Sequence, residues 1–181
     1  MPDAPPQAAA AAFRSDVQLA VIGEVVAAAG GAGVPVWLRG GWAMDFYLGE
    51  VTRPHLDVDW FCWDSDAEAV RAIVTGLGFT EYGDSPAQRD FLRDEVDLGF
   101  ALLGRGADGR PVVPSGPYAG APWPAGMLAG PLGRIGDLTC PVISPQAQIE
   151  LKLRYPEWNP ALARRDKDRA DIELLRARLA A

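Results

Sequence analysis

Alternation of apolar and polar positions marks several strands along the chain. Val34–Leu38 is β-branched and apolar between glycines, and Leu56–Trp63 alternates with a period of two, so each block predicts a strand. The blocks "AQRDFLRD" and "EVDLGFALL" predict two further strands joined by a turn near Arg93–Glu95, and "LTCPVIS" predicts a short strand later in the chain. The chain is therefore expected to contain a β-sheet.

Other segments, before and between these strands, show the spacing of apolar residues that is typical of helices. An alanine-rich run over residues 7–29 predicts a helix that ends at the glycines of 30–33, and "GWAMDFYLG" predicts a short helix ending near Gly49. "DAEAVRAIVTGLGF" predicts an amphipathic helix. Helices and strands in this order predict a mixed α/β or α+β fold.

Chain length and a change in composition set the expected domain organisation. The 181 residues predict a single domain over 7–181, preceded by a disordered stretch at 1–6. Residues 104–136 are rich in glycine and proline and show no helical period, and a loop of this length in a compact domain is usually functional. Two helices are predicted within 144–180, the last covering roughly 161–179.

Charge and cysteine content exclude several classes of protein. The formal net charge of -7 argues against a nucleic-acid partner and favours a cationic one. Cys62 and Cys140 fit neither a metal spacing nor a disulfide framework and are expected to be small buried residues, as in a reducing cytoplasm. The N-terminus lacks the features of a signal peptide, and no apolar run is judged long enough to span a bilayer. We expect a cytoplasmic protein without a membrane partner.

Two aspartates interrupt the apolar strand "LDVDWFCW". Residues two apart in a strand point to the same face, so Asp57 and Asp59 project together and their like charges repel. A divalent cation removes this conflict, and Mg²⁺ is typically held by one or two carboxylates together with substrate phosphates. The alternative is that the pair lies on a solvated face of an edge strand.

Two neighbouring features favour the metal site. Gly40-Gly41 stands where a strand turns into a helix, where free N–H groups and the helix dipole suit a triphosphate, although an ordinary tight turn has the same sequence. Asp97 is a single acid in the apolar block "EVDLGF". If its strand pairs with that of Asp57 and Asp59, three carboxylates converge on a site for one or two Mg²⁺ ions and an in-line displacement at phosphorus.

This array resembles the nucleotidyltransferase superfamily of the DNA polymerase beta type. The longer string "GGWAMDFYLGEVTRPHLDVDWFCW" is similar to the small antibiotic nucleotidyltransferases, the aminoglycoside 2''-adenylyltransferases and the lincosamide nucleotidyltransferases. The resemblance continues more loosely through "VDL", "GRIGDLTCPVIS" and "KDRADIELL", and covers most of the chain from Val34 onward. It implies an α+β polymerase-beta-like nucleotidyltransferase fold, with a mixed β-sheet flanked by helices and with C-terminal helices.

The resemblance implies roles for the three acids and the two glycines. Asp57 and Asp59 are expected to be Mg²⁺ ligands. Asp97 matches the third acid, and it either completes the metal site or accepts the proton from the substrate hydroxyl. Gly40 and Gly41 are assigned to the triphosphate of the nucleotide.

Cationic and aromatic residues complete the expected site. Arg53 and Lys152 are expected to reach phosphates, although plain solvation of Lys152 is an equal alternative, and Lys167 is expected on a solvated helix face. Tyr118 and Trp123 in the long loop are expected to contact the acceptor. No family pattern covers Arg39, which precedes the glycines.

Other notable residues are expected to be structural. His55 is expected to hydrogen-bond the loop before the strand and not to act as a base. Asp45 is expected to be a structural partner of that loop, with a wall of the acceptor pocket as the alternative. Trp42 and Trp60 are expected in the core, and the acids of the last helix are expected on a solvated face: Asp166, Asp168 and Asp171.

The expected activity is transfer of a nucleoside monophosphate from an NTP, ATP being the expected donor, to a hydroxyl of a small molecule. An aminoglycoside, a lincosamide or a natural metabolite remains open as the acceptor. Two alternatives stand beside this hypothesis. One is a nucleotidyltransferase of the same fold that modifies a protein or RNA in a toxin-antitoxin pair, and the other is a non-catalytic member that binds nucleotide or a partner.

Overall fold

The structure, a computed structural model, describes residues 6–83, 85–158 and 166–181. Two short 3-10 helices, at Asp64–Asp66 and Met127–Ala129, lie among the longer elements. The helices and strands in chain order are α1 (Pro6–Ala32), β1 (Val36–Arg39), α2 (Gly40–Leu48), β2 (Val58–Trp63), α3 (Ala67–Gly76), β3 (Thr80–Tyr82), β4 (Gln88–Arg93), β5 (Val96–Arg105), β6 (Pro111–Val112), β7 (Leu132–Ile135), β8 (Leu138–Pro141), α4 (Pro145–Trp158) and α5 (Asp166–Leu179).

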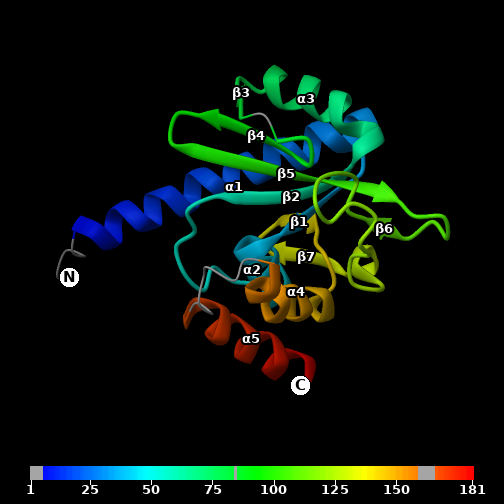
Figure 1. The fold of residues 1–181 in the computed structure, drawn as a ribbon. Helices are drawn as coiled ribbons and strands as arrows, with labels where there is room; N and C mark the ends of the chain where they lie inside the picture. The colour runs from blue at the N-terminus through cyan, green and yellow to red at the C-terminus, as the bar shows by residue number, and fades with distance from the viewer. Residues whose placement is uncertain (1–5, 84, 159–165) are drawn as a thin grey trace.

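A mixed sheet forms the centre of the molecule (Figure 1). Its strands follow the order β1-β2-β5-β4-β3, with β6 added along β5. The pair β2 and β5 is parallel, and the other pairs in this sheet are antiparallel. A separate two-stranded unit, β7-β8, contacts α2. The pairing of β2 with β5 was the condition for bringing Asp97 to the other two acids, and it is met.

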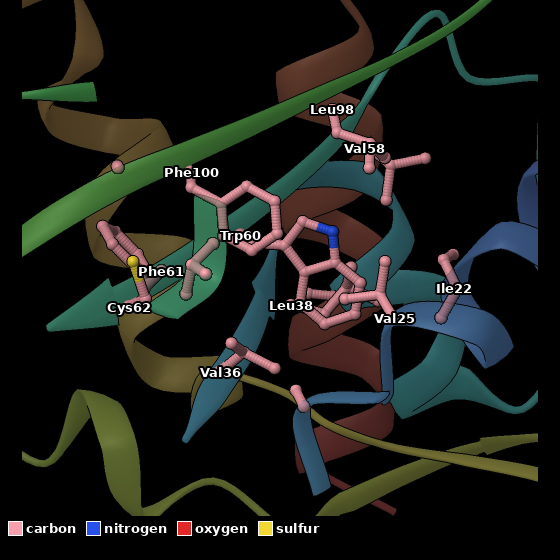
Figure 2. Close-up of a cluster of buried hydrophobic side chains, with 14 of the residues drawn as sticks. Ile22, Val25, Val36, Leu38, Val58, Trp60, Phe61, Cys62, Leu98 and Phe100 are labelled. Atoms are coloured by element: carbon pink, nitrogen blue, oxygen red, sulfur yellow. The ribbon is translucent and has the colours of Figure 1, made fainter. Parts of the chain in front are cut away.

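One face of the sheet carries the hydrophobic core (Figure 2). Alternate residues of β2 point to this face, and Trp60 is fully buried there against Phe100 of β5. The two rings stack with centroids 6.0 Å apart. From α1, Ile22 and Val25 pack into the same cluster, so this helix covers the apolar face of the sheet. Trp42 is also buried in the core, as predicted.

The opposite face of the same strands carries polar side chains at their centre. Arg39 of β1 stands beside Asp59 of β2 in the register, Asp59 beside Gly99 of β5, and Gly99 beside Asp90 of β4. Because paired residues point to the same side, these residues form one row across four strands. The period-two pattern of β2 thus places Trp60 on the core face of the sheet and Asp59 on the opposite, polar face.

Helix α1 is longer than its sequence pattern indicated. It continues through Gly30 and Gly31 to Ala32, and Pro6 is its first residue, while residues 1–5 lie outside the described part of the chain. By length and composition alone, its segment Arg14–Ala32 would suffice to cross a membrane, so the expectation that no apolar run is long enough was wrong. Its apolar face is nevertheless buried in the core, as in a helix that packs on a sheet.

Several boundaries differ from those predicted. Asp57 precedes β2 and is not part of it. The stretch 104–136, expected to be one long loop, contains β6 and the whole of β7. Strand β7 was missed because it pairs with β8, and this pairing has no local sequence signal. Strand β3 was not predicted. The expected start of the last helix at 159–160 falls outside the described residues, and α5 is described from Asp166.

Candidate active site

Asp59 stands at the centre of the polar row. A Cβ atom at position 99 would lie 2.9 Å from Asp59 Oδ1, so Gly99 provides the space that the Asp59 carboxylate fills. Gly40, with a φ of +69°, lies against the other carboxylate oxygen, because a Cβ there would be 3.4 Å from Asp59 Oδ2.

Two further acids lie at the ends of the paired strands. The parallel register of β2 and β5 begins at Val58 and Leu98, and Asp57 and Asp97 each come one residue before this pair. Val96, Leu98 and Phe100 are buried, so Asp97 points away from the core, as its alternation predicted. The structure therefore brings Asp57, Asp59 and Asp97 to one edge of the sheet.

The electrostatic environment of Asp59 fits a site for a cation. Burial raises the pKa of Asp59 above its ordinary value, and the negative charges of Asp57, Asp97 and Asp90 raise it further, while Arg39 opposes the rise. A divalent cation at this edge would remove the repulsion. Among the residues that the structure describes, no group of three or more His, Cys, Asp or Glu side chains is already arranged around a single metal position.

Asp97 has a partner that the sequence did not suggest. The hydroxyl of Tyr82 on β3 donates a hydrogen bond of 2.8 Å to Asp97 Oδ1. This contact, with burial as the second cause, raises the pKa of Tyr82 to about 12, so the phenol keeps its proton and holds the carboxylate in one orientation. Asp90 is another residue near the site that sequence reasoning missed: its charge acts on Asp59, and its Oδ1 accepts a hydrogen bond of 2.6 Å from Gln88 Nε2.

A cleft of about 400 Å³ opens beside these acids. Gly40 and Gly41 lie at its wall, where α2 begins directly after β1. Its lining combines backbone, acidic and cationic groups from the two ends of the chain: Gly40, Gly41, Arg53, Pro54, His55, Leu56, Asp57, Asp59, Lys152, Lys167 and Asp168. The cleft has the composition of a site for a phosphate-bearing ligand next to a metal.

Only glycine fits at position 41, because the His55 side chain packs directly against it. A Cβ at position 41 would meet the His55 ring within 2.4 Å, so a larger residue would displace this buried side chain. His55 Nδ1 lies 3.0 Å from Arg53 Nη1 and must accept this hydrogen bond, since a guanidinium only donates. Its Nε2 therefore carries the proton and donates to Asp45 Oδ2 at 2.7 Å.

Asp45 anchors the loop between α2 and β2. It is fully buried and accepts hydrogen bonds from the hydroxyl of Thr52 at 2.6 Å and from the backbone N–H of Thr52 at 3.1 Å. Both His55 and Asp45 thus have the structural roles predicted for them. Because Asp45 holds the His55 ring, and the ring accepts a hydrogen bond from Arg53, Asp45 also helps to fix the position of Arg53 at the cleft.

Helix α5 contributes a buried ionic network to the cleft. Asp171 accepts two hydrogen bonds from Arg53, at 2.9 and 3.2 Å, and one from Lys152 at 2.7 Å. Lys152 also lies 3.5 Å from Asp168. Only 1% of Asp171 and 2% of Asp168 is exposed, so the prediction of a solvated helix face was wrong for both residues.

The missed residues of α5 carry a recognisable signal. Asp168, Asp171, Ile172 and Leu175 recur with helical spacing and are the buried residues of this helix. Two acids on the apolar face of an amphipathic helix indicate that buried cations meet them. Lys167 is exposed, as predicted, and it also lines the cleft.

A second cavity, of about 270 Å³, lies on the same sheet face as Asp59. It contains the two aromatic residues expected to contact the acceptor, Tyr118 and Trp123. The Trp123 ring packs edge-on against Phe61 of β2, with centroids 5.1 Å apart. Phe61 is two residues after Asp59 on the same face, so this cavity lies further along β2 than the cleft that Asp59 lines.

Solved structures with a similar fold define the fold class of the chain. The crystal structure of ANT(2'')-Ia in complex with adenylyl-2''-tobramycin is similar with a TM-score of 0.75 and 24% identity, over 90% of this chain and 90% of that chain. The crystal structure of the lincosamide antibiotic adenylyltransferase LnuA, lincomycin-bound, is similar with a TM-score of 0.64 and 20% identity, over 82% of this chain and 89% of that chain. The chain has the nucleotidyltransferase fold, which confirms the predicted fold class.

The sequence then assigns the family within this class. The family model described as aminoglycoside-2''-adenylyltransferase matches residues 21–175, so the chain belongs to this family. A 2''-aminoglycoside nucleotidyltransferase of Escherichia coli is 41% identical over 83 residues. That match covers 46% of this chain and 41% of the relative, so the chain spans less than half the length of the curated relative. The resemblance to the small antibiotic nucleotidyltransferases is confirmed.

Proposed function

We propose that this chain transfers a nucleoside monophosphate from an NTP to a hydroxyl of a small antibiotic-like acceptor. The observation that carries the proposal is the placement of Asp57 and Asp59 at the mouth of a cleft that also holds the glycine pair and three cationic side chains. ATP is the proposed donor, and the family and the named relatives favour an antibiotic acceptor. The cytoplasm, which supplies ATP, is the proposed place of action.

Each part of the site has a role in the proposed reaction. The cationic side chains Arg53, Lys152 and Lys167 would bind the triphosphate as it enters the cleft. The acceptor oxygen attacks the α-phosphorus, a new O–P bond forms, and the bond to the bridging oxygen breaks so that pyrophosphate leaves. Asp97, held by Tyr82, would accept the proton of the attacking hydroxyl.

The donor set fits a magnesium site. Asp57 and Asp59 offer hard oxygen ligands, and the pKa of the buried Asp59 carboxyl is raised although Arg39 partly compensates its charge. When bound there, Mg²⁺ would neutralise phosphate charge and align the α-phosphorus for in-line attack. Asp97 is proposed as the base, with a third position in the metal site as the alternative role.

A direct assay tests the proposal. Purified protein is incubated with ATP or GTP, MgCl₂ and either tobramycin or lincomycin, and pyrophosphate and product mass are measured. We expect magnesium-dependent pyrophosphate release together with a product whose mass has increased by one nucleoside monophosphate. EDTA and Asp59→Asn should each abolish both signals.

Two other results would identify the alternatives. Labelling of a protein or RNA in a cell extract, without modification of any small molecule, would indicate the toxin-antitoxin type of activity. Tight binding of ATP with no pyrophosphate release under any condition would indicate a non-catalytic member. Either outcome contradicts the proposed function.

A further inference from the structure

The cavity of about 270 Å³ beside the carboxylates has a mainly apolar lining. Its walls come mainly from apolar side chains of β5 and of the segment after β6, including Ala101, Leu102, Val113, Pro122 and Trp123. No Asp or Glu is among the described residues that line it. A polyamine would therefore enter an apolar space without an anionic partner on the walls.

Arg39 is the charged group best placed to bind a ligand in this cavity. Its guanidinium lies over the Phe61 ring, 4.7 Å from the ring centroid, and it lines the cavity. Within the ranges 6–83, 85–158 and 166–181, no group accepts a hydrogen bond from this guanidinium, which has five N–H donors. The donors of Arg39 are thus available to oxygen atoms of a ligand.

The second cation at the cavity, Arg154, is already engaged. Its guanidinium lies 3.4 Å from Glu150 and 3.6 Å from Glu157, all on α4. These two acids neutralise the charge of Arg154. Arg39 is therefore the residue that sets which ligand charge the cavity prefers. Arg39 interacts electrostatically with Asp59, so a ligand bound to it would be adjacent to the proposed reaction centre.

We propose that this cavity receives an amphipathic acceptor with one apolar ring and an oxygen-bearing group, a carboxylate or an amide carbonyl, that Arg39 binds. This inference rests on the proposed function only in treating the ligand as the nucleotidyl acceptor. Pockets for drug-sized ligands measure about 300–1,000 Å³, so this cavity holds a single substituted ring and not a whole multi-ring aminoglycoside. The ring would stack on Trp123 and lie near Ala101, with its hydroxyl toward Asp59 and Asp97.

The charge preference can be measured with two probes of equal shape. They are 4-(hydroxymethyl)benzoate and 4-(hydroxymethyl)benzylamine, which carry opposite charges on the same ring alcohol. Binding is followed by NMR through the indole N–H signal of Trp123, assigned with Trp123→Phe. We expect the benzoate to bind about tenfold more tightly or better, because a charge-assisted hydrogen bond to Arg39 forms only with the carboxylate.

Variants locate the preference at Arg39. Arg39→Ala and Arg39→Gln should each remove the advantage of the benzoate, while Arg39→Lys should retain part of it without the bidentate geometry. Arg105→Ala is the matched control, because Arg105 also stacks on an aromatic ring, that of Trp63 at 3.8 Å, but lies outside the cavity. It should leave both affinities unchanged.

Three results would overturn the inference: an amine probe that binds as tightly as the benzoate, a benzoate affinity unaffected in the Arg39 variants, or no shift of the Trp123 signal with either probe. The comparison on the wild-type protein needs no variant, so poor folding of a variant would not leave the question open.

Pyrophosphate release separates this inference from the proposed function. Turnover of tobramycin together with a preference for the amine probe would overturn the inference and support the function. A preference for the benzoate without pyrophosphate release from any acceptor would support the cavity assignment and contradict the function. Turnover of lincomycin, which has an amide carbonyl and a hydrocarbon side chain, in preference to tobramycin would support both.

Discussion

Asp59 is held in a space that two glycines leave free. Gly99 and Gly40 lie against its two carboxylate oxygens, and three other acids lie near enough to raise its pKa beyond the effect of burial. Such a carboxylate is costly in the protein alone and favourable only with a cation beside it. The surroundings of this one residue therefore favour the cation that we propose to bind beside it.

The substitutions Asp57→Asn and Asp59→Asn should abolish turnover and preserve the fold. Because the pKa of Asp59 is raised in the folded state, its ionisation destabilises the metal-free protein at pH 7 and has no cost below the unfolded pKa of about 3.9. Asp59→Asn should then raise the Tm of metal-free protein at pH 7, with a gain that fades toward acid pH. Calorimetry across pH measures this, with the exposed Asp16→Asn on α1 as control. Near-normal turnover at saturating Mg²⁺ would contradict the metal assignment.

Asp97 is the residue on which the proposed chemistry depends most. If it is the base, Asp97→Asn should lower kcat by about two to four orders of magnitude, the usual scale for loss of a general base. ATP binding should persist, since Asp57 and Asp59 remain. Tyr82→Phe, which removes the hydrogen bond and keeps the carboxylate, should cause a smaller loss. A loss below tenfold in Asp97→Asn at saturating substrates would rule out the role of base.

At the scale of elements, the segment after β6 and helix α5 close the two sides of the site. The segment after β6 brings Trp123 onto Phe61 beside the second cavity, while α5 brings Asp171 under Arg53 and Lys152 at the cleft. In the proposed reaction, the segment after β6 contacts the acceptor and α5 supports the residues that bind the nucleotide.

Trp123→Ala should weaken acceptor binding and leave ATP binding nearly unchanged. The indole lines the acceptor cavity and is absent from the cleft lined by the glycines and Lys152. Steady-state kinetics should show a higher KM for the acceptor with an unaltered KM for ATP. Trp37→Ala, which removes another aromatic residue packed on the same sheet, controls for general loss of packing. Equal losses for both substrates would contradict the assignment of the cavity to the acceptor.

Asp171→Asn should destabilise the protein and weaken ATP binding together. Burial raises the pKa of Asp171, but hydrogen bonds from Arg53 and Lys152 outweigh it, so the net pKa is lowered. Its ionised form therefore contributes stability above the unfolded pKa of about 3.9, and this contribution is lost as the pH falls through the folded pKa. We expect a loss of up to about 3 kcal/mol at pH 7 that shrinks below about pH 4.

Denaturant unfolding at several pH values measures this difference, and the KM for ATP gives the second readout. Asp166→Asn on the exposed side of α5 is the matched control and should change neither quantity. A pH-independent loss of stability in Asp171→Asn would show that packing, and not charge, accounts for the effect.

At the scale of the whole molecule, the cleft joins parts of the chain that are far apart. Its lining comes from α2, from the loop before β2, from β2 itself, from α4 and from α5. Figure 1 shows α4 and α5 together on one side of the sheet, with α3 at the opposite end. A ligand in the cleft would therefore hold separate elements together.

Mg²⁺ with ATP should stabilise the entire fold. At a nucleotide concentration of about one hundred times Kd, binding adds about 2.7 kcal/mol, which corresponds to a rise in Tm of roughly 5–10 °C for a chain of this size. Differential scanning fluorimetry measures the shift. Asp59→Asn should lose most of it, while Asp16→Asn should keep it. A shift of equal size with ATP and EDTA would contradict a metal-dependent nucleotide site.

Much of the fold could be predicted from local patterns. The alternation in "LDVDWFCW" and "EVDLGF" identified β2 and β5 and the side to which their acids point. Strands β3, β6 and β7 were missed. Strands β3 and β6 are only three and two residues long, and β7 is stabilised by pairing with β8. Local propensity in strands is weak compared with such pairing.

The sequence by itself determined that Asp59 points away from the core face of β2 and that Gly40-Gly41 starts a helix, because both follow from backbone geometry within a few residues. Only the tertiary structure decided that Tyr82 binds Asp97, that Asp90 joins the acidic row, and that Arg53 reaches Asp171, a residue 118 positions away. These contacts arise from strand pairing and from the docking of α5. Their free energy depends on burial and on partners that no local stretch of sequence contains.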